Sequence, residues 1–360
     1  MVLEIDGSFG EGGGQILRIS VALAAIAGKS IRIHNIRVKR SPPGIRPQHE
    51  TSVKSVVTLS QAEVKGLEIG STELEFHPTR ITTGKFHFTT GTAASTSLIL
   101  QSLMPIMAFS NGKSWVEIHG GTNNPLAPPI DYLQEVLLPI LAKLGFKGSV
   151  ELVRRGFYPQ GGGIVRALVE PIRTLSPIVL TEFGEVSRIY GLSYSSRLPH
   201  HIVERMARSA NSTLTNEGVR EADIKLECLQ SNDKCVASNP GCGIILIAKS
   251  SKGAILGSDS LGEEGKPAEI VGQEAAESLC KQLKIRAPID KHLGDQLIPY
   301  MALAKGRSEI KVEELSLHTI SCIHVSKIIL GTNFELIGGK DKPTSIICDG
   351  IGFENGSPFA

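Results

Sequence analysis

The chain has few aromatic residues and no strong charge of either sign. Of its 360 residues, 5% are aromatic, one is tryptophan, and the formal net charge is +2. A charge this small does not draw in nucleic acid through the field of the whole molecule, so a polyanion would have to be held by a local group of cations. No apolar run reaches the roughly 18 residues that span a membrane. We expect a cytoplasmic protein without a membrane segment.

The cysteines give no sign of a zinc site. The chain has six of them and no CxxC pair, although Cys228, Cys235 and Cys242 recur at intervals of seven residues. Structural zinc sites usually take closely spaced pairs of ligands. This spacing therefore favours cysteines without a metal.

Glycine is abundant, with 38 residues, and the opening motif GSFGEGGGQILR, residues 7–18, is rich in it. Three adjacent glycines stand there between Glu11 and Arg18. The alternating residues 2–5 predict a strand, and the apolar spacing after Gln15 predicts a helix. Bare N–H groups at a helix N-terminus attract anions. The motif fits neither standard nucleotide fingerprint, so it indicates either a phosphate site or a tight turn without a ligand.

A basic segment follows the strand expected over residues 30–36. It contains no acidic residue, and its cations are Arg32, Arg37, Lys39, Arg40 and Arg46. The stretch SPPGIRPQH, residues 41–49, has three prolines and a glycine and predicts an irregular loop. If the first two strands are neighbours, this loop brings cations to the glycine-rich turn. A solvated basic loop is the alternative.

Two kinds of internal repeat indicate a unit that is used several times. GFYPQGGGIVR, residues 156–166, repeats the glycine spacing of the opening motif, and the helical segments LMPIMA, LLPILA and LIPYMA each have proline at the third position. Proline inside a helix costs about 3 kcal/mol unless the structure accommodates it. Repeated βα units predict an α/β protein with helices packed on sheets. Neither repeat occurs between residues 178 and 285, which predicts an inserted domain.

Three smaller expectations concern single segments. Gln101 in an apolar helix is either a satisfied core amide or a ligand contact. Residues 258–266 of the inserted region are expected to form a loop. The stretch after Gly331, with GGKDKP and the final ENGSPFA, is expected to close a sheet and then to fray.

Taken together, these motifs resemble those of the RNA 3'-terminal phosphate cyclase family. RGFYPQGGGIV, residues 155–165, resembles the family signature, and EGGGQILR, RSPPGIRPQH, GGTNNPLAPP, HLGDQL and SLHTIS resemble its other motifs in the family's order. The resemblance covers essentially the whole chain. It implies a large domain of three βα repeats, similar to the C-terminal domain of a translation initiation factor, at residues 1–181 and 288–360. A smaller α/β domain would be inserted at residues 182–287.

The resemblance also implies a reaction, the ATP-dependent conversion of an RNA 3'-phosphate into a 2',3'-cyclic phosphate. In the family AMP is first joined to a histidine, which His318 matches, and neutral imidazole is available for this step near neutral pH. AMP then passes to the RNA 3'-phosphate, and the 2'-OH displaces it. Cys322 stands where the family commonly has asparagine. The implied partners are single-stranded RNA 3'-phosphate ends of any sequence, and a homodimer is left open.

Further site residues follow from the same matches. Glu11 matches a carboxylate that contacts Mg²⁺ or Mn²⁺. Arg18, Arg37 and Arg40 match arginines that hold phosphates, which guanidinium binds through two hydrogen bonds. The positions that match nucleotide-binding residues are His49, Gln101, Pro128, His292, Asp295 and Gln296. The ring of His292 is expected to stack on adenine.

Two other readings remain open from the sequence. A cyclase-like ribosomal-RNA processing factor would keep the fold without catalysis, but such relatives lack the nucleophilic histidine that His318 matches. An enzyme of another class could use the glycine-rich turns for a sugar phosphate. Binding of ATP with Mg²⁺ would distinguish a cyclase from the latter.

Overall fold

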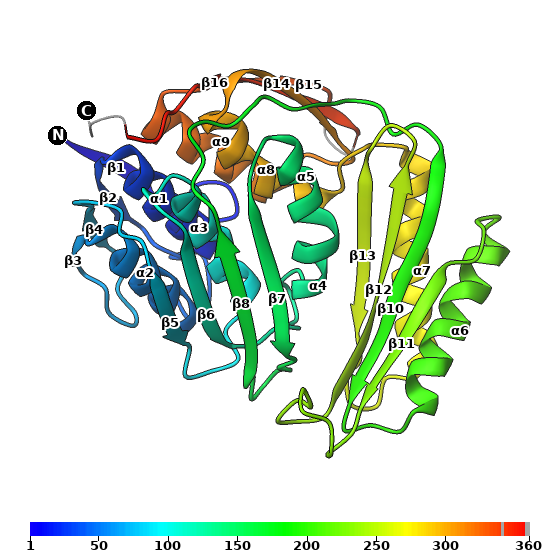
Figure 1. The fold of residues 1–360 in the computed structure, drawn as a ribbon. Helices are drawn as coiled ribbons and strands as arrows, with labels where there is room; N and C mark the ends of the chain where they lie inside the picture. The colour runs from blue at the N-terminus through cyan, green and yellow to red at the C-terminus, as the bar shows by residue number, and fades with distance from the viewer. Residues whose placement is uncertain (340–341, 357–360) are drawn as a thin grey trace.

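The computed structural model describes residues 1–339 and 342–356, and it confirms the predicted α/β class. Within these residues the strands form sheets of four strands each, and helices alternate with strands along the chain. Figure 1 shows the sheets arranged around a group of central helices, with one further sheet and its helices at the right.

The first sheet has the strand order β1-β2-β4-β3. Strand β1 runs parallel to β2, and β4 runs antiparallel to both β2 and β3. The strands are β1 (Val2–Asp6), β2 (Ser30–His34), β3 (Glu63–Lys65) and β4 (Leu74–His77). The helices of this unit are α1 (Gly14–Ala27) and α2 (Pro47–Ser60).

The second sheet repeats this pairing in the order β5-β6-β8-β7. Its strands are β5 (Lys85–Thr89), β6 (Ser114–Gly120), β7 (Gly148–Arg154) and β8 (Gly163–Val169). Its helical segments are α3 (Thr96–Ala108), α4 (Ile130–Tyr132), the π-helical turn η1 (Leu133–Leu137) and α5 (Leu138–Lys143). Pro139 follows η1 and has no N–H with which to continue the α-helical ladder.

The third sheet has the same connectivity, in the order β9-β14-β16-β15. Its strands are β9 (Val179–Leu180), β14 (Lys305–Val312), β15 (Asn333–Ile337) and β16 (Thr344–Ile351). Its helices are α8 (Lys291–Leu303) and α9 (Leu317–Leu330). The three proline-containing repeats fall in α3, in η1 with α5, and in α8. Helices α3 and α8 are the first helices of their units, whereas η1 and α5 follow the second strand of the second unit.

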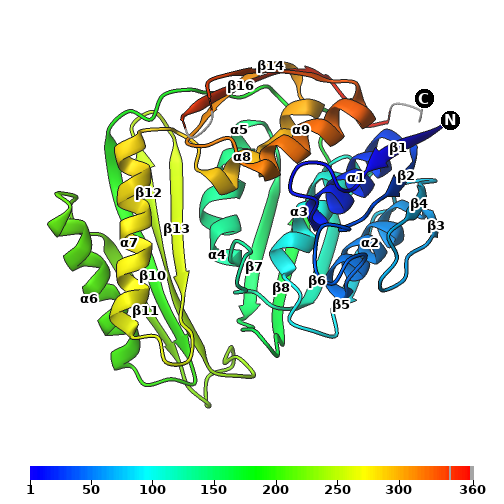
Figure 2. The same cartoon turned by 180° about the vertical axis from the view of Figure 1, so that it is seen from behind.

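A fourth sheet is formed by the chain between β9 and α8, in the order β11-β10-β12-β13. Its strands are β10 (Val186–Ser196), β11 (Asp223–Leu229), β12 (Gly241–Ser250) and β13 (Ile255–Leu261). Helices α6 (His201–Asn216) and α7 (Ala268–Ile285) pack on each other and on this sheet. Figures 1 and 2 show both helices on the side away from the rest of the molecule. The exact domain boundaries stay a prediction.

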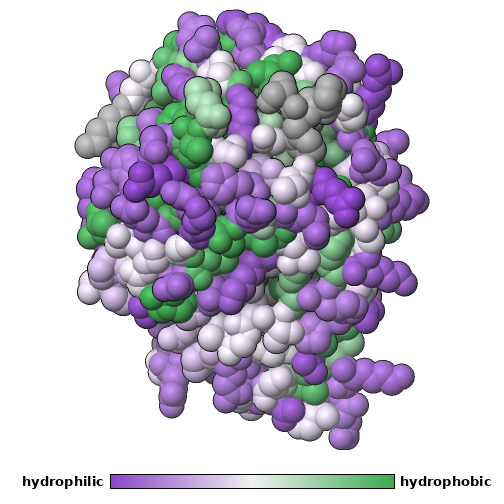
Figure 3. All heavy atoms as spheres, turned by 90° about the vertical axis from the view of Figure 1, so that its left-hand side faces the viewer, coloured by the Kyte–Doolittle hydropathy of each residue, from purple (hydrophilic) through white to green (hydrophobic). Residues whose placement is uncertain are grey.

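The helices of the three similar units meet in the centre of the large part of the molecule. Helix α1 packs against α2, α3 and α9, and every residue from Gln15 to Ile26 is buried. Apolar side chains fill most of this core, so the polar Gln15 and Arg18 on α1 are exceptions that call for partners. The outer face shown in Figure 3 is mostly hydrophilic, with hydrophobic side chains in separate patches.

Two local expectations were wrong. The loop predicted over residues 41–49 ends earlier, because α2 begins at Pro47, and proline is well tolerated in the first turn of a helix. Part of the loop predicted over residues 258–266 belongs to β13, which ends at Leu261.

The end of the chain was predicted only in part. Strand β16 closes the third sheet between β14 and β15, as expected of the segment after Gly331. The expected fraying falls on residues 357–360, which lie outside the described residues, as do residues 340 and 341 of GGKDKP. Among the helices that the structure does describe, none combines the length and apolar character needed to cross a membrane.

Candidate functional site

His318 lies in the first turn of α9, close to the glycine-rich loop between β1 and α1. The hydroxyl of Ser316 caps the helix by accepting a hydrogen bond from the Thr319 N–H at 3.1 Å. A Cβ added to Gly10 would lie 2.5 Å from Ser321 Oγ, so the loop approaches α9 more closely than a side chain would allow. The N-terminus of this helix, with its dipole and free N–H groups, is a favourable place for an anion.

Two oxygen atoms face the ring nitrogen Nδ1 of His318. The side-chain oxygen of Gln15 lies in hydrogen-bonding contact with it, and Glu11 Oε2 lies 3.1 Å away. The other carboxylate oxygen of Glu11 forms an ion pair with Arg40. Because amide and carboxylate oxygens accept hydrogen bonds, this arrangement favours a proton on Nδ1 and leaves Nε2 unprotonated.

The surroundings of His318 favour the neutral ring. Burial lowers the pKa of His318, and the nearby Arg18 and Arg40 lower it further, against the opposing effect of Glu11. The side chain is still 49% exposed, so a ligand can reach the ring. A neutral and accessible imidazole is the form that acts as a nucleophile.

Gln15 connects three helices, and the sequence reasoning assigned it no role. Its amide nitrogen donates hydrogen bonds to Asp295 on α8 and, at 3.0 Å, to Cys322 Sγ on α9. Burial raises the pKa of Asp295 to about 7, although the Gln15 hydrogen bond and Arg18 act in the opposite direction. The sequence did carry a signal for Gln15, because it is a polar residue in an otherwise apolar helix. The same kind of signal singled out Gln101.

Arg18 and His49 form a buried pair of polar groups behind the glycine turn. Arg18 is 8% exposed and His49 is 2% exposed. Burial lowers the pKa of His49 to about 3, with Arg18 as the next cause, so its ring is neutral. His49 Nδ1 accepts a hydrogen bond from the Arg46 N–H at 3.2 Å. A Cβ on Gly14 would lie 2.1 Å from His49 Nε2, which makes glycine necessary at this position.

The basic loop is only partly directed at His318. Arg40 reaches Glu11, as described, but Arg37 donates hydrogen bonds to the carbonyls of Pro42 and Gly44 at 3.0 and 2.9 Å. Arg37 also has a positive φ of 54°, an uncommon conformation for a residue with a side chain. In this structure Arg37 therefore shapes the loop and makes no contact with His318.

The remaining candidates lie on the α8 side of the site. Gln101, Asp295 and Gln296 lie together with Gln15 around a small cavity of about 10 Å³, which has room for at most one water molecule. Gln296 Nε2 donates to the carbonyl of His292 at 2.7 Å, and Gln296 Oε1 is buried without a partner among the described residues. A buried and unpaired acceptor of this kind suits a ligand that donates a hydrogen bond.

His292 and Pro128 are less closely tied to the other candidates. The exposed ring of His292 stands edge-on to Tyr132, with 6.3 Å between the ring centroids. The carbonyl of Pro128 accepts a hydrogen bond from Ser97 Oγ at 2.7 Å. Neither side chain contacts His318 in this structure.

The donor atoms around His318 fit a divalent cation only in part. Within residues 1–339 and 342–356 no group of three or more histidine, cysteine or acidic side chains is placed to hold a metal. Mg²⁺ is commonly bound by one or two carboxylates together with water and substrate phosphates. Glu11 can supply such a carboxylate once it is released from Arg40.

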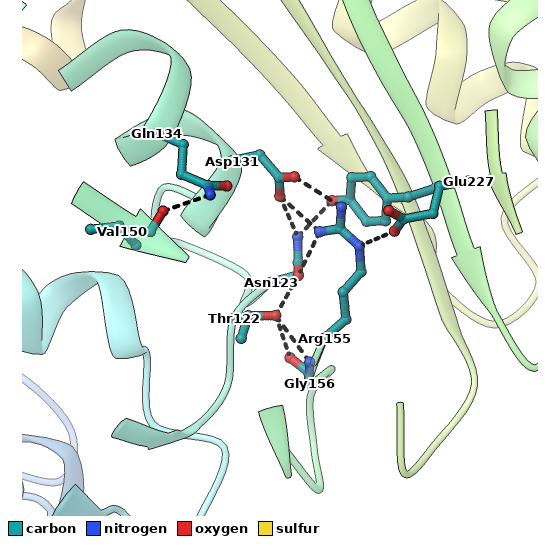
Figure 4. A network of polar contacts seen from close by, with 9 residues as sticks. Thr122, Asn123, Asp131, Gln134, Val150, Arg155, Gly156 and Glu227 are labelled. Carbon is teal, nitrogen blue, oxygen red and sulfur yellow. Dashed lines mark hydrogen bonds and ion pairs between the residues drawn. The ribbon is translucent and has the colours of Figure 1, made fainter. Parts of the chain in front are cut away.

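The signature segment lies elsewhere and forms its own buried network, shown in Figure 4. The Arg155 guanidinium binds both oxygens of Asp131 at 2.8 and 2.9 Å and Glu227 Oε1 at 2.7 Å. Its central carbon lies 3.9 Å from the centre of the Tyr194 ring. Asp131 belongs to α4, whereas Tyr194 and Glu227 belong to β10 and β11. This arginine therefore joins the second unit to the fourth sheet.

Comparison with known proteins gives one consistent result. The sequence model of a family described as RNA 3'-terminal phosphate cyclase matches residues 9–336. A protein of that name from Staphylothermus marinus is 45% identical over 353 residues, which cover 98% of this chain and 99% of that one. The protein of the same name from Hyperthermus butylicus is 48% identical over 345 residues, covering 94% and 95% of the two chains.

Proposed function

The chain belongs to the RNA 3'-terminal phosphate cyclase family and is an enzyme of that family, and we propose that it uses ATP to close RNA 3'-phosphate ends into 2',3'-cyclic phosphates through an AMP-histidine intermediate. The observation that carries the proposal is the pair of acceptors at His318 Nδ1, the Gln15 side-chain oxygen and Glu11 Oε2. They support an imidazole whose free Nε2 can attack phosphorus.

In the proposed first step, Nε2 of His318 attacks the α-phosphate of ATP, a P–N bond forms, and pyrophosphate leaves with the electron pair of the broken P–O bond. The lowered pKa of His318 supports this step, because no proton has to be removed from Nε2 first. In the second step an oxygen of the RNA 3'-phosphate attacks the same phosphorus and frees the histidine.

In the third step the 2'-OH of the RNA attacks the 3'-phosphorus and AMP leaves. An oxygen of the free 3'-phosphate would be a very poor leaving group. After the transfer of AMP in the second step, that oxygen belongs to AMP, which departs readily. The reacting groups are already in one molecule, so proximity removes much of the barrier. The 2'-OH proton is lost to a base.

In the proposed reaction the charged residues near His318 bind phosphates. Arg18, Arg40 and the N-terminus of α9 surround His318 with positive charge, and Arg37 would join them by leaving the loop carbonyls that it now binds. Glu11 would hold Mg²⁺ or Mn²⁺, which when bound neutralises charge on the phosphates. His49, neutral and buried beside Arg18, would line the phosphate site with it.

The nucleoside of ATP is proposed to bind along α8. Asp295, Gln296 and Gln101 lie together there around a cavity of about 10 Å³, too small for a nucleoside, so the nucleoside would lie against these residues from outside it. Gln296 Oε1 offers an unpaired acceptor for an amino or hydroxyl group. His292 would stack on the adenine ring, with Pro128 on its other face. The protein would bind the RNA only at its 3' end, as a single strand of any sequence. The reaction would take place in the cytoplasm.

The test uses a single-stranded RNA with a 3'-phosphate, incubated with the protein, ATP and Mg²⁺. The expected product resists removal of its phosphate by a phosphatase, as a cyclic phosphate does, and forms together with one AMP. The same RNA with a 3'-hydroxyl is the control and stays unchanged. Unchanged 3'-phosphate RNA with folded protein would favour a non-catalytic RNA-processing role.

A further inference from the structure

Asp290 lies where the fourth sheet, the second unit and α8 meet. It is completely buried and precedes α8 as its capping residue. A charged side chain is costly to bury unless hydrogen bonds satisfy it. The structure provides donors from all three parts of the molecule, which makes this carboxylate a junction between them.

The two oxygens of Asp290 face different neighbours. Oδ1 accepts hydrogen bonds from the N–H groups of His292 and Leu293, at 2.9 and 2.8 Å, and so caps α8. Oδ2 accepts one from the Gly257 N–H on β13, at 3.3 Å. The Tyr132 hydroxyl on α4 lies 2.7 and 2.8 Å from the two oxygens and bridges them.

Strand β13 also packs closely against α4 and η1 at Gly257. A Cβ on Gly257 would lie 2.7 Å from Cε2 of Tyr132 and 2.9 Å from Cγ2 of Val136. Strand β13 can therefore lie against Tyr132 only because residue 257 is glycine. The Tyr132 ring and the Gly257 backbone together fix the fourth sheet at the start of α8.

Helix α8 carries three of the residues to which the proposed function gives nucleotide contacts. They follow Asp290 by two, five and six positions: His292, Asp295 and Gln296. The N–H of His292 itself binds Asp290, and Asp295 accepts a hydrogen bond from Gln15. A shift of this helix would move these three residues relative to His318.

We propose that Asp290, held by Tyr132 and Gly257, is a positioning residue through which the fourth sheet sets the place of α8 for ATP binding. This inference rests on the proposed function. The fourth sheet would then hold His292, Asp295 and Gln296 of α8 at a fixed position relative to His318. The hydroxyl of Tyr132 is the part of the junction that a single small substitution can remove.

The test compares Tyr132→Phe and Asp290→Asn with Tyr190→Phe. Asparagine still caps a helix well but has one acceptor fewer for Tyr132 and Gly257. The control Tyr190→Phe removes another hydroxyl between the fourth sheet and the second unit, which binds Glu135 at 2.8 Å and does not touch α8. The probe is α,β-methylene ATP with Mg²⁺, whose bridging carbon prevents the loss of pyrophosphate, and binding is measured by calorimetry.

Both test variants are expected to bind this nucleotide about threefold to tenfold more weakly than the wild type, because a hydrogen bond that holds the start of α8 is lost. The KM for ATP should rise in parallel, while the KM for the RNA end stays unchanged. Hydrogen exchange should accelerate at the amides of His292 and Leu293. Tyr190→Phe should match the wild type in each measurement.

Equal nucleotide affinity in Tyr132→Phe, Tyr190→Phe and the wild type would overturn the inference, and so would an equal rise of both KM values. A wild type that binds no nucleotide would instead overturn the proposed function. If Asp290→Asn does not fold, Tyr132→Phe still decides, because it keeps the ring and loses one oxygen.

Discussion

The side-chain oxygen of Gln15 is in hydrogen-bonding contact with Nδ1 of His318, and this contact joins α1 to α9. The amide nitrogen of the same side chain binds Asp295 on α8. One residue thus connects the proposed nucleophile to the helix that carries the proposed nucleoside-binding residues. The contact fixes both the direction of the imidazole ring and the nitrogen that carries its proton.

Replacing Gln15 by leucine should slow the attachment of AMP by about tenfold to a hundredfold, the range expected when a hydrogen bond that orients a reacting group is lost. The ring of His318 would keep Glu11 as its only oxygen partner at Nδ1. The rate is measured in a single turnover with labelled ATP. Gln273→Leu, an exposed glutamine on α7, is the matched control and should react like the wild type. An unchanged rate in Gln15→Leu would refute the orienting role.

The stability of the protein should depend on pH through Asp295. Burial raises the pKa of this carboxyl to about 7, whereas an aspartate in an unfolded chain has a pKa near 3.9. The folded state therefore binds this proton more tightly, and the group makes folding less favourable as the pH rises from about 4 to about 7.

Asp295→Asn should accordingly be more stable than the wild type above about pH 7, by up to about 4 kcal/mol in free energy of unfolding, and the difference should shrink towards pH 4. Urea unfolding at pH 5 and pH 8 measures it. Asp223→Asn, at an exposed aspartate, serves as control. A difference that grows towards low pH would have the wrong sign for this account.

The buried Arg155 should contribute far more to stability than an exposed arginine in a similar setting. Arg155→Ala leaves Asp131 buried without its partner and should cost about 3–5 kcal/mol of unfolding free energy. Arg188 also lies over a tyrosine ring and pairs with Asp223 at 3.0 Å, but both members of that pair are exposed. Arg188→Ala should cost about 0–1 kcal/mol. Chemical denaturation of both variants tests this, and equal costs would contradict it.

Binding of RNA should depend only weakly on salt. If the protein holds the 3'-phosphate end and few other phosphates, a plot of log affinity against log salt should have a slope shallower than about −5. Arg40→Gln should make the slope shallower by about one unit, because one phosphate contact is lost, and Arg188→Gln should leave it unchanged. A slope of about −5 or steeper in the wild type would indicate a long RNA-binding track instead.

Sequence motifs singled out several candidate residues that are far apart in the chain, and the structure places some of them side by side while their roles stay predictions. The basic loop was expected near the glycine-rich turn if β1 and β2 are neighbours, which they are, whereas His318 was added by resemblance alone. In the structure Glu11 contacts both Arg40 and His318. Gln15 was missed because a glutamine within an apolar helix looks the same whether it fills the core or binds a functional group. Only its neighbours, Asp295 and Cys322, distinguish the two cases.

The α/β class and the repeated units were also predictable, but some local structure was not. Residues 41–49 contain three prolines, which favours a loop, yet Pro47 starts α2 because its fixed φ suits a first helical turn. The small polar residues 258–260 look like a loop but pair with β12. An aspartate before α8 is compatible with a helix cap, but the rest of the junction at Asp290 had no sequence signal, since Tyr132 and Gly257 lie far away in the chain.

The most direct test of the proposed function is labelling of the protein with ATP that carries ³²P in its α-phosphate, with Mg²⁺ and without RNA, followed by denaturing electrophoresis. The wild type should retain label that is lost in mild acid, as a phosphorus–nitrogen bond to histidine requires. His318→Ala should take up none, whereas His324→Ala, at another histidine of α9, should be labelled like the wild type. Absence of label on folded wild type, or undiminished label on His318→Ala, would contradict the account.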